Sequence, residues 1–166
     1  TLGSDTCETI ALAKEKDAKV VIIPRSWIED YTQADVLVVN PNEMRSLVGL
    51  TGKGEAQAAA TQFATKHDVT IFLTLGSRGL FVCSPKQNIE QLVTTKAFRH
   101  AHKMGARDMV VAIVAVGLAL EIPVLDIAQL ANVFANLVVQ QHGNGTVTWK
   151  DLFRAIHIPQ PEPVTP

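Results

Sequence analysis

Residues 69–83 read VTIFLTLGSRGLFVC, with two apolar runs on either side of a turn that contains Gly76 and Gly79. A run without alternating polar residues predicts a strand that is covered on both faces, as in a parallel sheet. Two runs of the same kind precede this stretch, KVVII at 19–23 and DVLVV at 35–39. Together these runs predict the central sheet of the fold.

Helical patterns alternate with the predicted strands along most of the chain, and a short further strand is expected near 90–94. This alternation predicts an α/β layered fold, in which helices flank a mostly parallel sheet. The longest apolar run, 109–120, is shorter than the ~18–20 residues that span a bilayer and predicts a helix buried on all sides. The expected helices lie at 5–16, 43–50, 54–67, 106–120, 123–140 and 149–157.

Length and composition limit the classes of protein that the chain can represent. Its 166 residues predict one domain at 1–157, followed by an extended proline-rich tail at 158–166. A hydrophobic fraction of 47% and a net charge of −1 exclude a disordered chain and indicate no nucleic-acid or membrane partner. No signal peptide is visible, so an intracellular protein is expected. Cys7 and Cys83 follow no metal or redox spacing and are expected to be buried thiols.

Polar and glycine residues follow the predicted strands at the carboxyl edge, where open parallel sheets bind ligands. Asn40 and Glu43, after the run at 35–39, place an amide and a carboxylate where a hydrated magnesium ion could be held. Gly76 and Gly79 would let a nucleotide approach the backbone. Each motif also has a structural interpretation, because Asn-Pro-Asn is a good turn sequence and a glycine after a strand often marks a turn.

The helix expected at 106–120 begins with the sequence Gly105-Ala106-Arg107-Asp108. Backbone N–H groups at a helix N-terminus have no partner within the helix and form a ready anion site. Asp108, in the first turn, could accept a proton from an attacking hydroxyl group. The alternative is the ordinary preference of acidic residues for the positive end of the helix dipole.

The order and spacing of these motifs resemble the ribokinase-like (PfkB-type) sugar kinases, and most closely the kinase domain of bacterial heptose-phosphate kinases. The resemblance implies a ribokinase-like, Rossmann-type fold with ATP at the carboxyl edge of the sheet. It also implies transfer of the ATP γ-phosphoryl group to a sugar hydroxyl. The matching positions are Asn40-x-x-Glu43, Thr74-x-Gly76-x-x-Gly79, Gly105-Ala106-Arg107-Asp108 and the stretch around Asn132.

The resemblance further implies a role for each matched position. Asp108 corresponds to the catalytic base, and the backbone of Gly105, Ala106 and Arg107 corresponds to the anion hole. ATP and magnesium are the implied cofactors, with Asn40 and Glu43 in the magnesium and phosphate network. The implied nucleotide-binding positions are Asn40, Glu43, Thr74, Gly76, Gly79 and Asn132.

The sequence departs from the family pattern because the N-terminal half of the family domain has no counterpart in it. That half carries most of the sugar contacts and the lid over the site. Sugar binding by this chain alone is therefore not expected. Without that half, a sheet edge and apolar surface would be open, so a protein partner or a homo-oligomer is expected to cover them.

The catalytic turn also departs from the family pattern, Asp-x-Thr-Gly-Ala-Gly-Asp, since residues 102–108 read HKMGARD. Arg107 replaces the second glycine, and losing one oxyanion-type donor costs ~2.7–4 kcal/mol of transition-state stabilisation. Alternatively, Arg107 and Lys103 could stabilise phosphate charge. His100 and His102 have no carboxylate or cysteine at matching spacing, so no metal site is expected there.

These departures favour a truncated, catalytically degenerate sugar-kinase-like protein that serves as a structural or accessory subunit of a larger assembly. One alternative is a fragment or split half of an active ATP-dependent carbohydrate kinase. The other is a regulatory module that binds a nucleotide without turnover. A sequence that supplies the sugar-binding half would favour the first alternative, and ATP binding that survives Asp108→Asn would favour the second.

Overall fold

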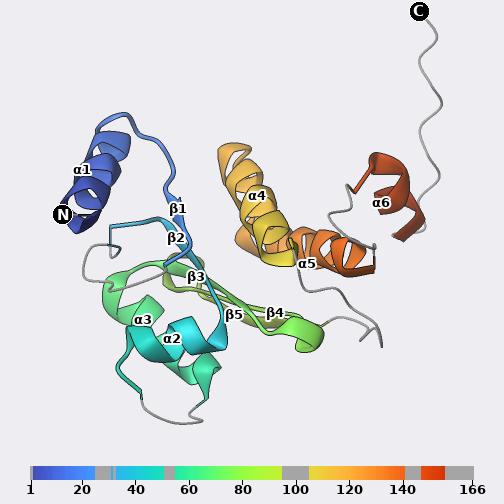
Figure 1. Ribbon diagram of the computed structural model, residues 1–166, viewed down its shortest axis with the longest axis horizontal. Coiled ribbons are helices and arrows are strands. Elements are labelled where there is room, and N and C mark those ends of the chain that lie inside the picture. Colours follow the sequence, from blue (N-terminus) through green and yellow to red (C-terminus); the bar gives the residue numbers. More distant parts are fainter. Residues whose placement is uncertain are drawn as a thin grey trace, which may run out of the picture.

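The computed structural model describes residues 2–24, 31, 33–50, 55–94, 105–140 and 147–155. At its centre is a five-stranded sheet in the order β1-β2-β3-β4-β5 (Figure 1). β1, β2 and β3 pair in parallel, and β4 is antiparallel to both β3 and β5. Only β4 runs against the others, so the predicted α/β fold with a mostly parallel sheet is confirmed. The strands are β1 (Val21–Ile22), β2 (Val36–Val39), β3 (Thr70–Thr74), β4 (Leu80–Ser84) and β5 (Ile89–Val93).

Helices cover both faces of the sheet (Figure 1). One face carries α2 (Pro41–Leu47) and α3 (Ala56–His67). The other face carries α4 (Ala106–Ala119) and α5 (Val124–Gln140), which pack closely on each other. α1 (Leu2–Glu15) precedes β1, and α6 (Trp149–Ala155) contacts α5. The predicted helices are therefore present in the described residues, with ends that differ by a few residues.

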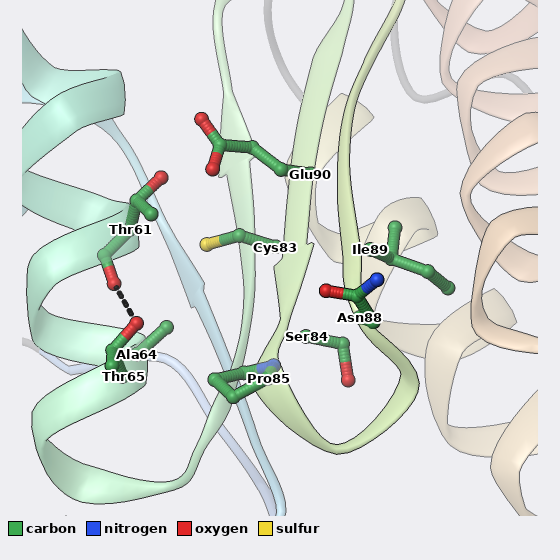
Figure 2. Close-up of a pocket in the computed structure, with 9 residues that line it drawn as sticks. All are labelled: Thr61, Ala64, Thr65, Cys83, Ser84, Pro85, Asn88, Ile89 and Glu90. Carbon is green, nitrogen blue, oxygen red and sulfur yellow. Dashed lines mark hydrogen bonds between the residues drawn. The ribbon is translucent and has the colours of Figure 1, made fainter.

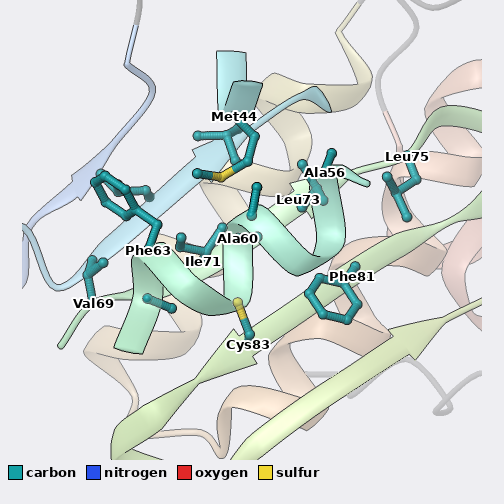
Figure 3. Packing of buried hydrophobic residues seen from close by; sticks show 14 of the residues in the cluster. Met44, Ala56, Ala60, Phe63, Val69, Ile71, Leu73, Leu75, Phe81 and Cys83 are labelled. Carbon is teal, nitrogen blue, oxygen red and sulfur yellow. The ribbon is translucent and has the colours of Figure 1, made fainter. Parts of the chain in front are cut away.

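β2 explains why the run at 35–39 is apolar at every position. Leu37 and Val39 face the core under α2 and α3, whereas Val36 and Val38 face the core under α4 and α5. All four side chains are at most 1% exposed. Figure 3 shows the first of these cores, in which residues of α2 and α3 pack on β3 and β4.

Three predictions about burial are wrong, one of them for Cys7, which is half-buried, whereas Cys83 is buried as predicted. The run at 19–23 forms only the short strand β1, which is half-buried because it is the edge strand of the described sheet. The run at 109–120 is not buried on all sides, because Val116 is 57% exposed and Leu120 is 67% exposed. α4 packs on the sheet and on α5 with one side only, and its opposite side is apolar and uncovered in the described part of the chain.

Some predicted features lie outside the described residues, namely the tail at 158–166, Lys103, His100 and His102. Among the residues that are described, no helix combines the length and the apolarity that a bilayer crossing requires.

Candidate functional site

The ends of β2 and β3 meet the start of α4 at the carboxyl edge of the sheet. Asn40 directly follows β2, and Thr74 is the last residue of β3. The Thr74 hydroxyl donates a hydrogen bond to the carbonyl oxygen of Val39, at 3.1 Å. This bond ties the two strand ends together, so the half-buried Thr74 side chain has a structural function at the edge.

Asn40 and Glu43 form a reciprocal cap at the start of α2. Asn40 Oδ1 accepts the N–H groups of Asn42 and Glu43, both at 2.9 Å. Glu43 Oε2 in turn accepts the N–H of Asn40 at 2.8 Å, and Pro41 occupies the first turn, where no N–H is needed. The structural interpretation of this motif therefore holds, and Asn40 Oδ1 is committed to the helix.

Glu43 also joins this cap to the first turn of α4. Its Oε1 accepts a hydrogen bond from Arg107 Nη1 at 2.5 Å, although the two residues are 64 positions apart in the sequence. The side chains are 21% exposed for Glu43 and 30% exposed for Arg107. The pair brings together two motifs that the sequence identified separately, and both oxygens of Glu43 now have hydrogen-bond partners.

No described side chain caps the N-terminus of α4. Gly105 is the N-cap residue with φ 78°, a left-handed conformation that glycine adopts readily. The N–H groups of the first turn have no partner within the helix. Asp108 lies exposed in that turn. The first turn of α4 therefore combines backbone N–H groups without a partner in the helix, the positive end of the helix dipole and the Asp108 carboxylate.

The two glycines of the turn after β3 have different surroundings. Gly76 has φ 63°, and a Cβ atom placed on it would meet nothing within 4 Å. Gly79 has φ 103°, and a Cβ there would lie 2.1 Å from the carbonyl oxygen of Val93 in β5. Among the described residues, Gly76 therefore leaves space beside the backbone, whereas Gly79 lets the turn between β3 and β4 lie directly against the end of β5.

Asn132, on α5, is 8% exposed and donates from Nδ2 to the carbonyl oxygen of Thr94, at 3.0 Å. It therefore fixes α5 to the end of β5. Val138, also on α5, lies 3.5 Å from a Cβ placed on Gly105, so α5 supports the start of α4. Sequence analysis missed the role of Val138, and its only signal was the apolar pattern of the helix.

A hollow of about 130 Å³ lies at the opposite edge of the sheet, between α3 and the turn that joins β4 to β5 (Figure 2). The Cys83 sulfur points toward α3, and burial, with a smaller contribution from Glu90, raises the pKa of this thiol to about 12. None of the motif residues contributes to this hollow. Its lining consists of Thr61, Ala64, Thr65, Cys83, Ser84, Pro85, Asn88, Ile89 and Glu90.

Metal ligands are sparse in the described ranges, where no group of three or more His, Cys, Asp or Glu side chains could hold an ion. Glu43 is the only carboxylate of the Asn-x-x-Glu motif, and it is already paired with a guanidinium. The Asn40–Glu43 pair as arranged does not fit a divalent cation, because the Glu43 charge is already paired with the Arg107 guanidinium and Asn40 Oδ1 already accepts two N–H groups.

Known proteins resemble the chain in sequence and in fold. The pfkB family carbohydrate kinase pattern matches residues 1–151. The Bifunctional protein HldE of Coxiella burnetii is 32% identical over 156 residues, which cover 89% of this chain and 32% of that protein. The protein of the same name from Pasteurella multocida is 30% identical over 151 residues, with the same coverage of 89% and 32%.

Solved structures agree with these matches. The ribokinase of Arabidopsis thaliana, complexed with ribose and ATP, superposes with a TM-score of 0.78 at 20% identity, over 95% of this chain and 52% of that chain. The Thermotoga maritima ribokinase gives a TM-score of 0.74 at 18% identity, over 90% and 52%. The chain thus spans about a third of the length of the curated relatives and about half of these ribokinases.

Proposed function

Because the chain belongs to the pfkB family of carbohydrate kinases, we propose that it is the nucleotide-binding half of an ATP-dependent sugar kinase. The observation that carries this proposal is the contact between Glu43 and Arg107. It supports the proposal because it joins the Asn-x-x-Glu motif to the altered Gly-Ala-Arg-Asp motif at the carboxyl edge of the sheet, beside the N-terminus of α4.

ATP fits this edge, because the start of α4 offers unpaired N–H groups and Gly76 leaves open space beside the backbone. When bound, ATP supplies the γ-phosphoryl group that is transferred. The backbone at Gly105, Ala106 and Arg107 would bind and orient phosphate oxygens. Asp108, exposed in the first turn, would accept the proton of the sugar hydroxyl.

The sugar would be bound with the help of a complementary half, defined here as the N-terminal part of a pfkB-type kinase domain. The chain spans about half of the ribokinases that share its fold, which supports such a complement. Within the described part of the chain, the outer edge of β1 and the apolar side of α4 are uncovered and could receive it. The similarity to HldE, and the resemblance to heptose-phosphate kinases, favour a phosphorylated heptose as the substrate.

Nucleotide binding without efficient turnover is the second candidate, and Arg107 is the observation that favours it. A side chain stands where the family pattern has a glycine, and its guanidinium is held on Glu43. Arg107 keeps its backbone N–H, but its side chain would hold the transferring phosphate away from that donor, and the loss of one anion-hole contact lowers the rate by about 10²–10³-fold. This candidate retains the binding site and differs only in the transfer step.

The test of the proposal is a titration of the ¹⁵N-labelled chain with ADP, followed by NMR. We expect the backbone N–H signals of Gly76, Ala106 and Arg107 to shift, because these groups line the proposed site. The signal of Asn88, at the opposite edge, should not move. Absence of shifts at the carboxyl edge, or shifts confined to the hollow near Asn88, would overturn the proposal.

Phosphoryl transfer separates the two candidates. The chain, combined with a complementary half from an HldE relative, is assayed for transfer from labelled ATP to a heptose phosphate. An active half predicts transfer that falls by about 10²–10⁴-fold in Asp108→Asn, because a general base contributes that much. The second candidate predicts ADP binding with no transfer above the Asp108→Asn level.

A further inference from the structure

Arg107 stands where the family pattern has a glycine, and its side chain reaches from α4 to α2. It belongs to the first turn of α4, yet its Nη1 lies 2.5 Å from Glu43 Oε1, on the cap of α2. Glu43 Oε2 is held by the Asn40 N–H at 2.8 Å. The guanidinium therefore takes the one carboxylate oxygen that the cap leaves available.

The ion pair between Arg107 and Glu43 is partly buried. The side chains are only 30% and 21% exposed, so the pair is partly shielded from solvent screening. A guanidinium presents five N–H donors in a fixed fork, and the bond to Glu43 uses Nη1. Donors on the rest of the fork can thus receive phosphate oxygens while the pair stays formed.

We propose that Arg107 occupies the position beside Glu43 that a divalent cation would need, so that this site receives nucleotide phosphates on a fixed guanidinium without a metal ion on Glu43. The phosphate part of this inference rests on the proposed function. The metal part does not, since it concerns only whether Glu43 can bind a cation while Arg107 is present.

A purely structural ion pair between α2 and α4 is the competing explanation. Removing such a pair would lower the stability of the fold, but it would not create a dependence on divalent cations. The two explanations therefore differ in one measurable quantity, the effect of a metal ion on nucleotide affinity. A change in fold stability alone would leave this effect unchanged. Coupling of this kind is reciprocal and can be measured from either ligand.

The experiment compares ADP affinity in MgCl₂ with ADP affinity in EDTA, by calorimetry on the full chain. We expect the unmodified chain to show little difference. Arg107→Gly should bind ADP about tenfold more tightly with Mg²⁺ than without it, because Glu43 is then open to the cation. The gain should disappear in the double variant Arg107→Gly/Glu43→Gln. Arg45→Ala, which removes a cation of α2 bonded to Asn42, is the control and should behave as the unmodified chain.

A second readout needs no nucleotide. Mn²⁺ alone is titrated and followed by electron paramagnetic resonance, and we expect binding to Arg107→Gly that is lost when Glu43 is also changed to Gln. Circular dichroism melts establish that each variant is folded, and Arg107→Gln replaces Arg107→Gly if the glycine variant is not.

Three results would overturn the inference. The unmodified chain could bind Mn²⁺ through Glu43, Mg²⁺ could tighten its ADP binding tenfold through Glu43, or both Arg107 variants could gain no cation binding with or without ADP. If no variant binds ADP, the proposed function fails, and the Mn²⁺ titration still decides the metal part of the inference.

Discussion

Gly79 shows what one residue contributes to the turn after β3. Its φ of 103° is rarely adopted by residues with a side chain, and a Cβ would lie 2.1 Å from the backbone oxygen of Val93. That oxygen belongs to β5 and cannot rotate away. We predict that Gly79→Ala lowers the free energy of unfolding by at least about 3 kcal/mol, from backbone strain and the clash together.

Gly76→Ala is the matched control for this prediction. It also has positive φ, at 63°, but its Cβ would meet nothing within 4 Å. We expect a loss of only about 1–2 kcal/mol, the cost of the left-handed conformation. Urea unfolding followed by circular dichroism measures both variants, and equal losses would show that the contact with β5 is not the cause.

Cys83 is predicted to be unreactive in the folded chain. Burial, aided by Glu90, raises the pKa of its thiol from 9.0 to about 12, so almost no thiolate forms at pH 8. In a Cys7→Ser background, a disulfide reagent should modify Cys83 only after unfolding. Fast modification of the folded chain would contradict the burial of this thiol.

The same shift has a consequence for stability at alkaline pH. The folded chain holds the thiol proton more tightly than the unfolded chain, so the unfolded chain loses its proton first as the pH rises. The contribution of Cys83 is therefore complete below about pH 9 and is lost as the pH approaches about 12. Cys83→Ala should flatten this part of the pH profile of unfolding.

At the scale of single residues, the sequence predicted local turns better than contacts between distant residues. Asn40 and Glu43 were recognised both as a motif and as a turn, and the structure has them as a capping box. The link to Arg107 could not be predicted, because a side-chain contact across 64 positions depends on where α2 and α4 dock on the sheet.

Among the helices, α4 and α5 owe their close packing to one glycine. A Cβ on Gly117 would lie 2.6 Å from Cγ1 and 2.8 Å from Cδ1 of Ile127, which is 1% exposed. Cγ1 is the inner part of a stiff, β-branched side chain and cannot move far. We predict that Gly117→Ala destabilises the fold by about 1–3 kcal/mol, although alanine favours helices by up to about 1 kcal/mol.

A double-mutant cycle tests this prediction. Ile127→Ala removes the atoms that the new Cβ would meet, so the double variant should be more stable than the sum of the two single effects implies. Thermal unfolding of the four proteins gives the coupling energy. Strict additivity would mean that α4 and α5 separate at no cost and that Gly117 is not the limiting contact.

The helices and strands themselves were largely predictable, and the errors have a common cause. Strand β2 and helix α5 match the expected positions closely because each pattern is set by local burial. The short, half-buried β1 and the uncovered side of α4 were predicted to be fully covered. An apolar pattern predicts that a surface is covered, but it does not identify a segment that covers it.

At the scale of the whole molecule, the two surfaces that are less buried than predicted lie next to each other, because α4 contacts β1. Strand β1 is the edge of the described sheet, and α4 contacts β1 and β2 from one face (Figure 1). Val116 on the outer side of α4 is 57% exposed, and Leu120, which directly follows this helix, is 67% exposed. An open parallel edge next to exposed apolar residues favours association with another segment. The complementary half of the kinase domain is the occupant that the proposed function requires.

The prediction for this surface is that Val116→Ser/Leu120→Ser weakens binding of the complementary half at least about tenfold, or about 1.4 kcal/mol. Burying these side chains stabilises the complex only while they are apolar, since the hydrophobic contribution scales with the apolar area removed from water. Binding of ADP to the chain alone should not change, because the proposed nucleotide site lies at the start of α4 and these residues lie at its other end. Leu92→Ser, an exposed residue on β5 at the far edge of the sheet, is the control and should leave the complex intact. Sedimentation velocity of the mixed halves measures the affinity. Equal binding by the double variant and the unmodified chain would mean that the complement uses another surface, and α4 would then be left without an explanation for its outer apolar side.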